Sequence, residues 1–216
     1  MNSFADAILV AILLISLLSL ASSRIVALVK LMALQGALVS LTPPMMAADA
    51  TDGGVALFCL IMLAVKAALI PWLLALALTK VAIKNEVEPI IGYHASLAVG
   101  LIFMLVATHL TGKLGLPLSD GRGLALAAAF TTMASGLFLM MSRTKAITQV
   151  IGYLILENGI YLTGATLTRH SHSHYIVEFG ILLDLLVAVM LMGIIVNNIN
   201  RAFDDVDTSR LESLKD

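Results

Sequence analysis

Seven long apolar runs dominate this chain and restrict its fold more than any other feature. Windows of about 20 apolar residues are long enough to cross the hydrocarbon core of a bilayer as α-helices. The runs lie at residues 4–21, 25–47, 55–79, 91–110, 122–141, 146–168 and 176–197. Their apolar residues are continuous, whereas membrane β-barrels alternate apolar and polar residues. The sequence therefore predicts an all-α integral membrane protein, a bundle of about seven transmembrane helices.

The composition supports a membrane protein and excludes several functions. Hydrophobic residues make up 60% of the 216 residues and charged residues 12%, whereas soluble domains are about 25% charged. A net charge of −1 gives no electrostatic basis for nucleic-acid binding. The single cysteine, Cys59, excludes an internal disulfide and a cysteine-ligated iron–sulfur cluster. The first run has no basic segment before it, so we expect a retained helix rather than a signal peptide.

The distribution of Lys and Arg predicts the orientation. Cytoplasmic connections carry an excess of basic residues. The odd-numbered connections and the polar tail carry Arg24, Lys80, Lys84, Arg143, Lys145, Arg201, Arg210 and Lys215. The even-numbered connections carry only Lys113, Arg122 and Arg169. We expect an outward N-terminus and a cytoplasmic C-terminus.

Three charged residues interrupt the apolar runs. Glu157 lies in GYLILENGIY, Asp184 in FGILLDLLVAVML and Lys66 in VALFCLIMLAVKAALIPWLL. A charge at the centre of a membrane helix costs about 2.5–3.5 kcal/mol, so these side chains should face protein or trapped water. They either exchange protons or serve as structural glue, with Glu157 and Lys66 as a fixed ion pair. Nearby small and polar residues, such as Asn158 and Tyr161, favour close packing and water.

Glu178 stands at the outer start of the last run. Its carboxylate favours the helix N-terminus electrostatically. The alternative is an outer proton station, because it precedes Asp184 by nearly two helical turns.

Two motifs in the last two runs resemble the hydrogenase-4 component E family. The family pattern is a GY…ENG helix followed by VE-x-G-x-x-x-D. The matching residues are Gly152, Tyr153, Glu157, Asn158, Gly159, Val177, Glu178, Gly180 and Asp184. Gln35, the stretch 66–71 and the tail at 207–215 are similar too. The resemblance implies a membrane subunit of formate hydrogenlyase or a related group 4 nickel–iron hydrogenase complex.

Within that family, residues 122–197 resemble the three-helix K subunit of NADH:quinone oxidoreductase and its Mrp-type antiporter counterpart. Those subunits carry a glutamate on their second and third helices, as parts of a proton path. Glu157 matches the first glutamate, and Asp184 matches the second as a shorter acid. The resemblance implies an N-terminal four-helix membrane extension (1–121), a K-subunit-like module (122–197) and a cytoplasmic tail (198–216).

The resemblance also implies a mechanism and partners. Glu157, Asp184, Lys66 and Glu178 would form a proton relay driven by redox chemistry in other subunits, with the Lys66 ammonium favouring the ionised form of a nearby acid. Expected partners are antiporter-like and quinone-oxidoreductase-like membrane subunits, a peripheral hydrogenase or other redox module, and lipid. Two other classes stay open: an independent cation/proton antiporter, and an assembly scaffold for larger antiporter-like subunits.

The histidines give no cofactor or metal prediction. His94 and His109 lie too far apart along one helix for a single haem site, so we expect an interfacial and a helix-end side chain. His170, His172 and His174 alternate in RHSHSHY and would share one face of an extended stretch, as in a metal site. We favour a solvated, pH-sensitive loop there and expect no cofactor in this chain.

Overall fold

The computed structural model describes residues 3–42, 53–80, 90–114 and 122–167, and these are helical over most of their length. The elements are α1 (Ser3–Ala21), α2 (Ile25–Ser40), α4 (Gly53–Ala64), η1 (Val65–Leu69), α5 (Ile70–Lys80), α6 (Tyr93–Lys113), α7 (Arg122–Ser142) and α8 (Ala146–Leu167). The elements α4, η1 and α5 follow one another without a break and form one rod. The described part of the chain confirms the all-α prediction. The predicted span 176–197 and the tail 198–216 lie outside it.

Five described helices are long and apolar enough to cross a membrane. They are Ser3–Ala21, Cys59–Leu76, Tyr93–Lys113, Arg122–Ser142 and Ala146–Leu167. The apolar helix α2 is shorter, with 16 residues, and ends at Ser40 rather than 47 as the sequence predicted. The fourth run also differs, because α6 starts two residues later and extends to Lys113. The count of seven helices and the orientation of the termini stay predictions.

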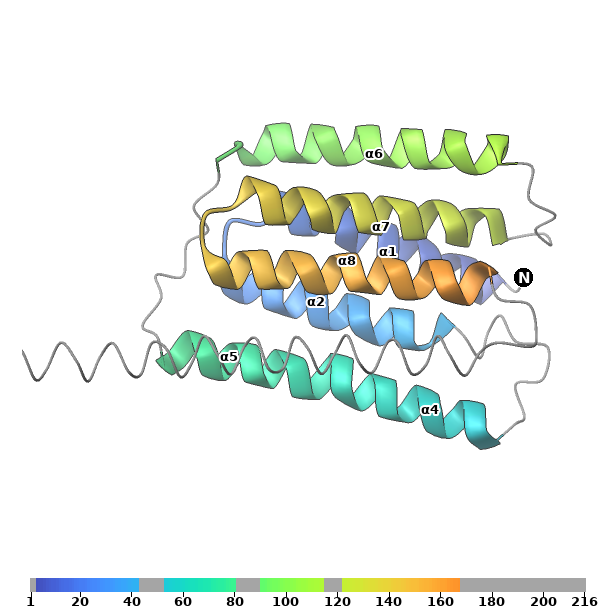
Figure 1. The fold of residues 1–216 in the computed structure, drawn as a ribbon, viewed down its shortest axis with the longest axis horizontal. Coiled ribbons are helices and arrows are strands. Elements are labelled where there is room, and N and C mark those ends of the chain that lie inside the picture. The colour runs from blue at the N-terminus through green and yellow to red at the C-terminus, as the bar shows by residue number, and fades with distance from the viewer. Residues whose placement is uncertain (1–2, 43–52, 81–89, 115–121, 168–216) are drawn as a thin grey trace, which may run out of the picture.

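The helices lie side by side with their long axes roughly aligned (Figure 1). Helix α7 packs along α8 and also contacts α1, while α2 contacts both α1 and α8. Helix α6 covers α7 and α1 on one side, and the rod covers α2 on the other. The described part of the predicted three-helix module therefore packs directly against the N-terminal helices. The division into segments itself stays a prediction.

Apolar side chains form two separate clusters along the bundle. One contains Leu20, Ile25, Ile70, Leu139 and Ile151, near the end where α7 turns into α8. The other contains Leu9, Val39, Met62, Ala128 and Leu162, near the opposite end. Between them lies a set of buried polar residues from five segments, which we name the polar layer. Its members are Ser16, Gln35, Lys66, Thr132, Glu157 and Asn158.

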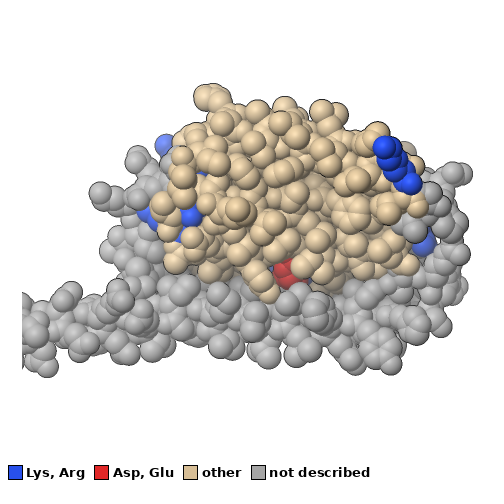
Figure 2. All heavy atoms as spheres, turned by 45° about the horizontal axis from the view of Figure 1, so that its top comes forward, with Lys and Arg blue, Asp and Glu red and all other residues tan. Residues whose placement is uncertain are grey.

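The charge distribution follows the same axis. On the face shown in Figure 2, basic side chains lie toward the two ends of the described bundle, and acidic atoms appear near its middle. Charges at the ends of membrane helices reach the interface with water, whereas a charge near the middle requires a partner.

Helices α7 and α8 approach each other at glycines, backbone to backbone. A Cβ atom on Gly136 would clash with the backbone nitrogen of Leu156. A Cβ on Gly159 would lie 2.7 Å from the backbone nitrogen of Met133. Small residues permit such close packing between membrane helices. Because Glu157 and Asn158 lie within this tightly packed part of α8, the contact fixes their position.

Arg143, between α7 and α8, ties several segments together at one end of the bundle. Its Nη2 donates to the Leu20 carbonyl (2.9 Å), and its Nη1 donates to the Ile91 carbonyl (3.3 Å). The guanidinium also lies over the Tyr93 ring, 5.2 Å from its centre. Burial lowers the pKa of Arg143, and the nearby Tyr93 acts in the opposite direction. From the sequence, Arg143 was counted among the basic residues of a cytoplasmic connection. The structure buries its side chain, which is only 1% exposed.

Candidate functional site

The candidate site begins at a distortion in the rod. Pro71 has no backbone N–H, and its ring would clash with the carbonyl four residues earlier, so a regular α-helix is disfavoured here. Residues Val65–Leu69 form a π-helical turn, in which the Ile70 N–H bonds to the Val65 carbonyl. Such turns inside α-helices are frequent at functional sites. The sequence predicted an uninterrupted helix over 55–79, and Pro71 is the residue that could have indicated this turn.

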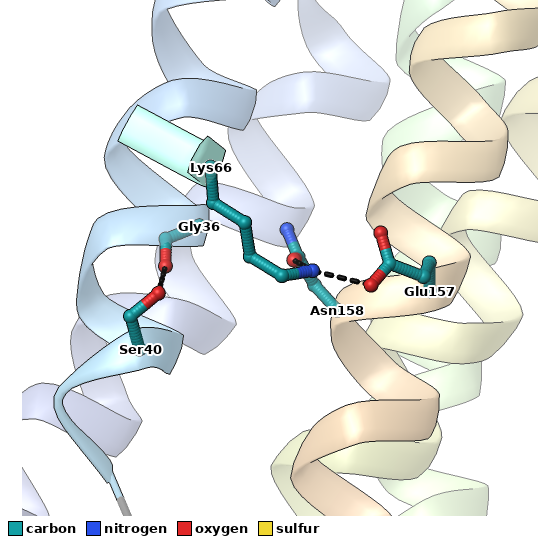
Figure 3. Close-up of polar contacts among 5 residues, drawn as sticks. All are labelled: Gly36, Ser40, Lys66, Glu157 and Asn158. Atoms are coloured by element: carbon teal, nitrogen blue, oxygen red, sulfur yellow. Dashed lines mark hydrogen bonds and ion pairs between the residues drawn. The ribbon is translucent and has the colours of Figure 1, made fainter. Parts of the chain in front are cut away.

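The π-helical turn carries Lys66, which extends across the bundle to α8 (Figure 3). Its Nζ donates to Glu157 Oε1 and, at 3.1 Å, to Asn158 Oδ1. The ammonium also lies 5.7 Å from the centre of the Tyr161 ring, within the range of a cation–π interaction. Lys66 is 3% exposed and Glu157 is 1% exposed. Two of the residues that the sequence singled out therefore form a buried ion pair.

Helix α2 supports the lysine from the other side. A Cβ on Gly36 would lie 3.1 Å from Lys66 Cβ and 3.5 Å from the Lys66 carbonyl oxygen. The absence of a side chain at Gly36 thus lets the π-helical turn pack against α2. One turn further on, the Ser40 hydroxyl donates to the Gly36 carbonyl at 2.7 Å (Figure 3).

Asn158 and Tyr161 complete the surroundings of the ammonium. From the sequence we expected these two residues only to favour close packing and water, and we predicted no contact with Lys66. The available signal was spacing, because Tyr161 lies four residues after Glu157 and so on the same helix face. An amide oxygen and an aromatic ring both attract a cation without adding charge. They can therefore keep the ammonium in place when the carboxylate is neutralised.

A second polar group joins three helices. Gln35 Nε2 on α2 donates to Ser16 Oγ on α1 at 2.8 Å. Ser16 Oγ lies 3.1 Å from Thr132 Oγ1 on α7. The sequence pointed to Gln35 only through the family resemblance, and it missed Ser16 and Thr132. Isolated hydroxyls in apolar helices carry little sequence signal, because most bond to their own backbone.

The remaining residues that the sequence singled out lie partly in the described part of the chain and partly outside it. His94 and His109 are exposed on α6, and Cys59 is buried. The described residues contain no group of three or more His, Cys, Asp or Glu able to hold a metal ion. Asp184, Glu178 and the histidines at 170, 172 and 174 lie outside the described residues, so their roles stay predictions.

Comparison with known proteins supports the resemblance seen in the sequence. Hydrogenase-4 component E of Escherichia coli (strain K12) is 26% identical over 150 residues, 69% of this chain and 68% of the relative. The same identity and coverage are found for hydrogenase-4 component E of Shigella flexneri. These proteins are distant homologues of the chain. The likeness of residues 122–197 to a K subunit stays a prediction.

A mycobacterial protein is more similar. The uncharacterized protein Rv0085 of Mycobacterium tuberculosis (strain ATCC 25618 / H37Rv) is 33% identical over 192 residues. The alignment covers 88% of this chain and 86% of the relative. No family model matches the chain, and no solved structure matches it significantly. With this identity over nearly the full length of both proteins, the chain belongs to the same family as Rv0085.

Proposed function

We propose that this chain is a membrane subunit of a hydrogenase complex, and that its Lys66–Glu157 pair takes part in proton translocation. The redox chemistry that drives translocation takes place in partner subunits, which include antiporter-like and quinone-oxidoreductase-like membrane proteins. Distant homology to proteins named hydrogenase-4 component E supports the hydrogenase assignment. We place the subunit in the bacterial inner membrane, in a complex of the formate hydrogenlyase type.

The observation that carries the proposal is the contact between Lys66 and Glu157 in the middle of two apolar helices. Replacing a buried ion pair by apolar residues is often neutral or stabilising. Stability alone is therefore a weak reason for two charges in a membrane-spanning bundle. Ionisable residues inside membrane segments typically mark ion or proton pathways.

The geometry suggests how the pair handles a proton. In the paired state, the Glu157 carboxylate balances the Lys66 ammonium. A proton that arrives at Glu157 neutralises the carboxylate and removes its Coulomb attraction for the ammonium. Asn158 Oδ1 and the Tyr161 ring still hold the ammonium, so the site accepts the extra positive charge without losing its shape. Asp184 and Glu178 would receive or supply that proton as further stations of the relay.

The decisive experiment is Glu157→Gln in the complete complex. Glutamine keeps an acceptor for Lys66 but cannot ionise, so we expect normal assembly with strongly reduced proton pumping in membrane vesicles. Asp6→Asn is the matched control, because Asp6 lies near one end of α1, outside the polar layer. Unchanged pumping per electron in Glu157→Gln would refute the proposed relay.

An assembly scaffold is the second candidate, and the direct Lys66–Glu157 contact favours it. A permanent ion pair would cross-link the rod to α8 and hold a docking surface in place. The double variant Lys66→Met/Glu157→Gln separates the two functions, since a scaffold without charges still supports coupled turnover and a relay does not. The antiporter alternative predicts cation/proton exchange by the purified chain alone in liposomes.

A further inference from the structure

The side-chain carbonyl oxygen of Gln35 is a buried hydrogen-bond acceptor that takes no part in the Lys66–Glu157 pair. The side chain is fully buried, and its Nε2 donates to Ser16. Its Oε1 has no donor within hydrogen-bonding distance among the described residues. A carbonyl left unpaired inside a membrane bundle is costly, because the bilayer core supplies no water. In native structures, an ordered water often satisfies such an atom.

Hydrogen bonds around Ser16 orient the Gln35 amide. The Ser16 hydroxyl donates to the Ile12 carbonyl at 2.9 Å and accepts from Gln35 Nε2. Ser16 Oγ is also hydrogen-bonded to Thr132 Oγ1 at 3.1 Å. With Nε2 directed at Ser16, Oε1 is left in need of an outside donor.

Gln35 directly precedes the residue of α2 that contacts Lys66. The next residue on α2 is Gly36, which packs against the backbone and Cβ of Lys66. On the other side, Ser135 lies one turn from Thr132 on α7, and its buried Oγ also has no partner among the described residues.

We propose that Gln35 Oε1 binds a buried water molecule in the polar layer, and that this water links the ion pair to the Gln35–Ser16–Thr132 chain. Water supplies the missing donor and, unlike an amide, readily accepts and releases protons. The bound water is independent of the proposed function. Its use as a side branch of the proton relay rests on that function.

A density map of the full chain in its complex, at a resolution that shows ordered waters elsewhere in the bundle, tests the site. We expect a water peak about 3 Å from Gln35 Oε1, its loss in Gln35→Leu and its retention in Thr131→Val. Thr131 is a matched control, because it is equally buried beside Thr132 but bonds to Ala127 of its own helix at 2.8 Å. A protein donor at Oε1, or no peak there, would overturn the inference.

Proton-transfer rates in the same variants test whether the bound water is a side branch of the proton relay. Loss of one net hydrogen bond corresponds to a roughly two- to tenfold change, so we expect Gln35→Leu and Thr132→Val to be slower by that factor. Thr131→Val should transfer protons at the unaltered rate. If Gln35→Leu is as fast as the unaltered chain while Glu157→Gln is slow, the branch is refuted and the relay stands. If Glu157→Gln is also unaffected, the proposed function itself fails.

Discussion

Replacing Lys66 by methionine removes the ammonium but keeps a side chain of similar length. The variant loses the Nζ hydrogen bonds to Glu157 and Asn158 and the contact with the Tyr161 ring. The Glu157 carboxylate, only 1% exposed, is then left without its cation. Removing one partner of a buried ion pair costs about 3–5 kcal/mol. We expect Lys66→Met to lower the free energy of unfolding by this amount at neutral pH.

The double variant Lys66→Met/Glu157→Gln removes both charges with little change in volume. No unpaired charge remains, so we expect it to lose only about 1 kcal/mol, the net value of a hydrogen bond. Glu157→Gln should lose little, because Asn158 Oδ1 and the Tyr161 ring still hold the ammonium, so Lys66→Met carries most of the summed loss of the two single variants. The interaction energy of this double-mutant cycle is therefore expected to be on the order of 3 kcal/mol.

Unfolding of the purified chain by sodium dodecyl sulfate in mild detergent, followed by circular dichroism, measures these energies. Lys30→Met is the matched control, because Lys30 is an exposed lysine on α2, and its loss should change stability by less than about 0.5 kcal/mol. Strictly additive losses would refute the energetic coupling of the pair.

Three further variants test the packing around the site in the same assay. Gly152→Ala should destabilise the chain by about 1–3 kcal/mol, because the new Cβ would lie 2.9 Å from a backbone nitrogen of α7. Gly100→Ala should cost less, because its new Cβ would contact only the side chains of leucines, which can move aside. Pro71→Ala restores a backbone N–H and should raise stability by no more than about 3 kcal/mol, while proton pumping in vesicles falls because the π-helical turn relaxes. Arg143→Met loses two charge-assisted hydrogen bonds to backbone carbonyls and should cost about 3 kcal/mol. Arg24→Met changes an exposed side chain and should leave the unfolding midpoint unchanged.

The helices were predictable from the sequence because the signal is local. An apolar run long enough to span a bilayer has to bond its backbone internally, so its helical structure follows from its composition. Helix ends were less predictable. Helix α6 continues to Lys113, although the predicted run ended at residue 110, because its backbone hydrogen bonds extend to Leu114.

The contacts of the site were only partly predictable. The cost of burial singled out Lys66 and Glu157, and a fixed pair between them was one of two open interpretations. Their contact depends on the packing of residues 91 positions apart, which no periodicity in a single sequence reveals. The same holds for Arg143, whose charge suggested an exposed connection, while the structure buries it against carbonyls from two distant segments.

The polar layer also has an electrical consequence. It crosses the bundle between two apolar clusters, and its members come from α1, α2, the rod, α7 and α8. Moving one charge across the whole membrane is worth about 2.3 kcal/mol per 100 mV, but a proton passed sideways between helices at one depth crosses almost none of that voltage drop. Transfers among these residues would be nearly independent of membrane potential. The membrane potential would instead affect the steps in which a proton crosses either of the two flanking apolar clusters, because the voltage drop falls across these regions.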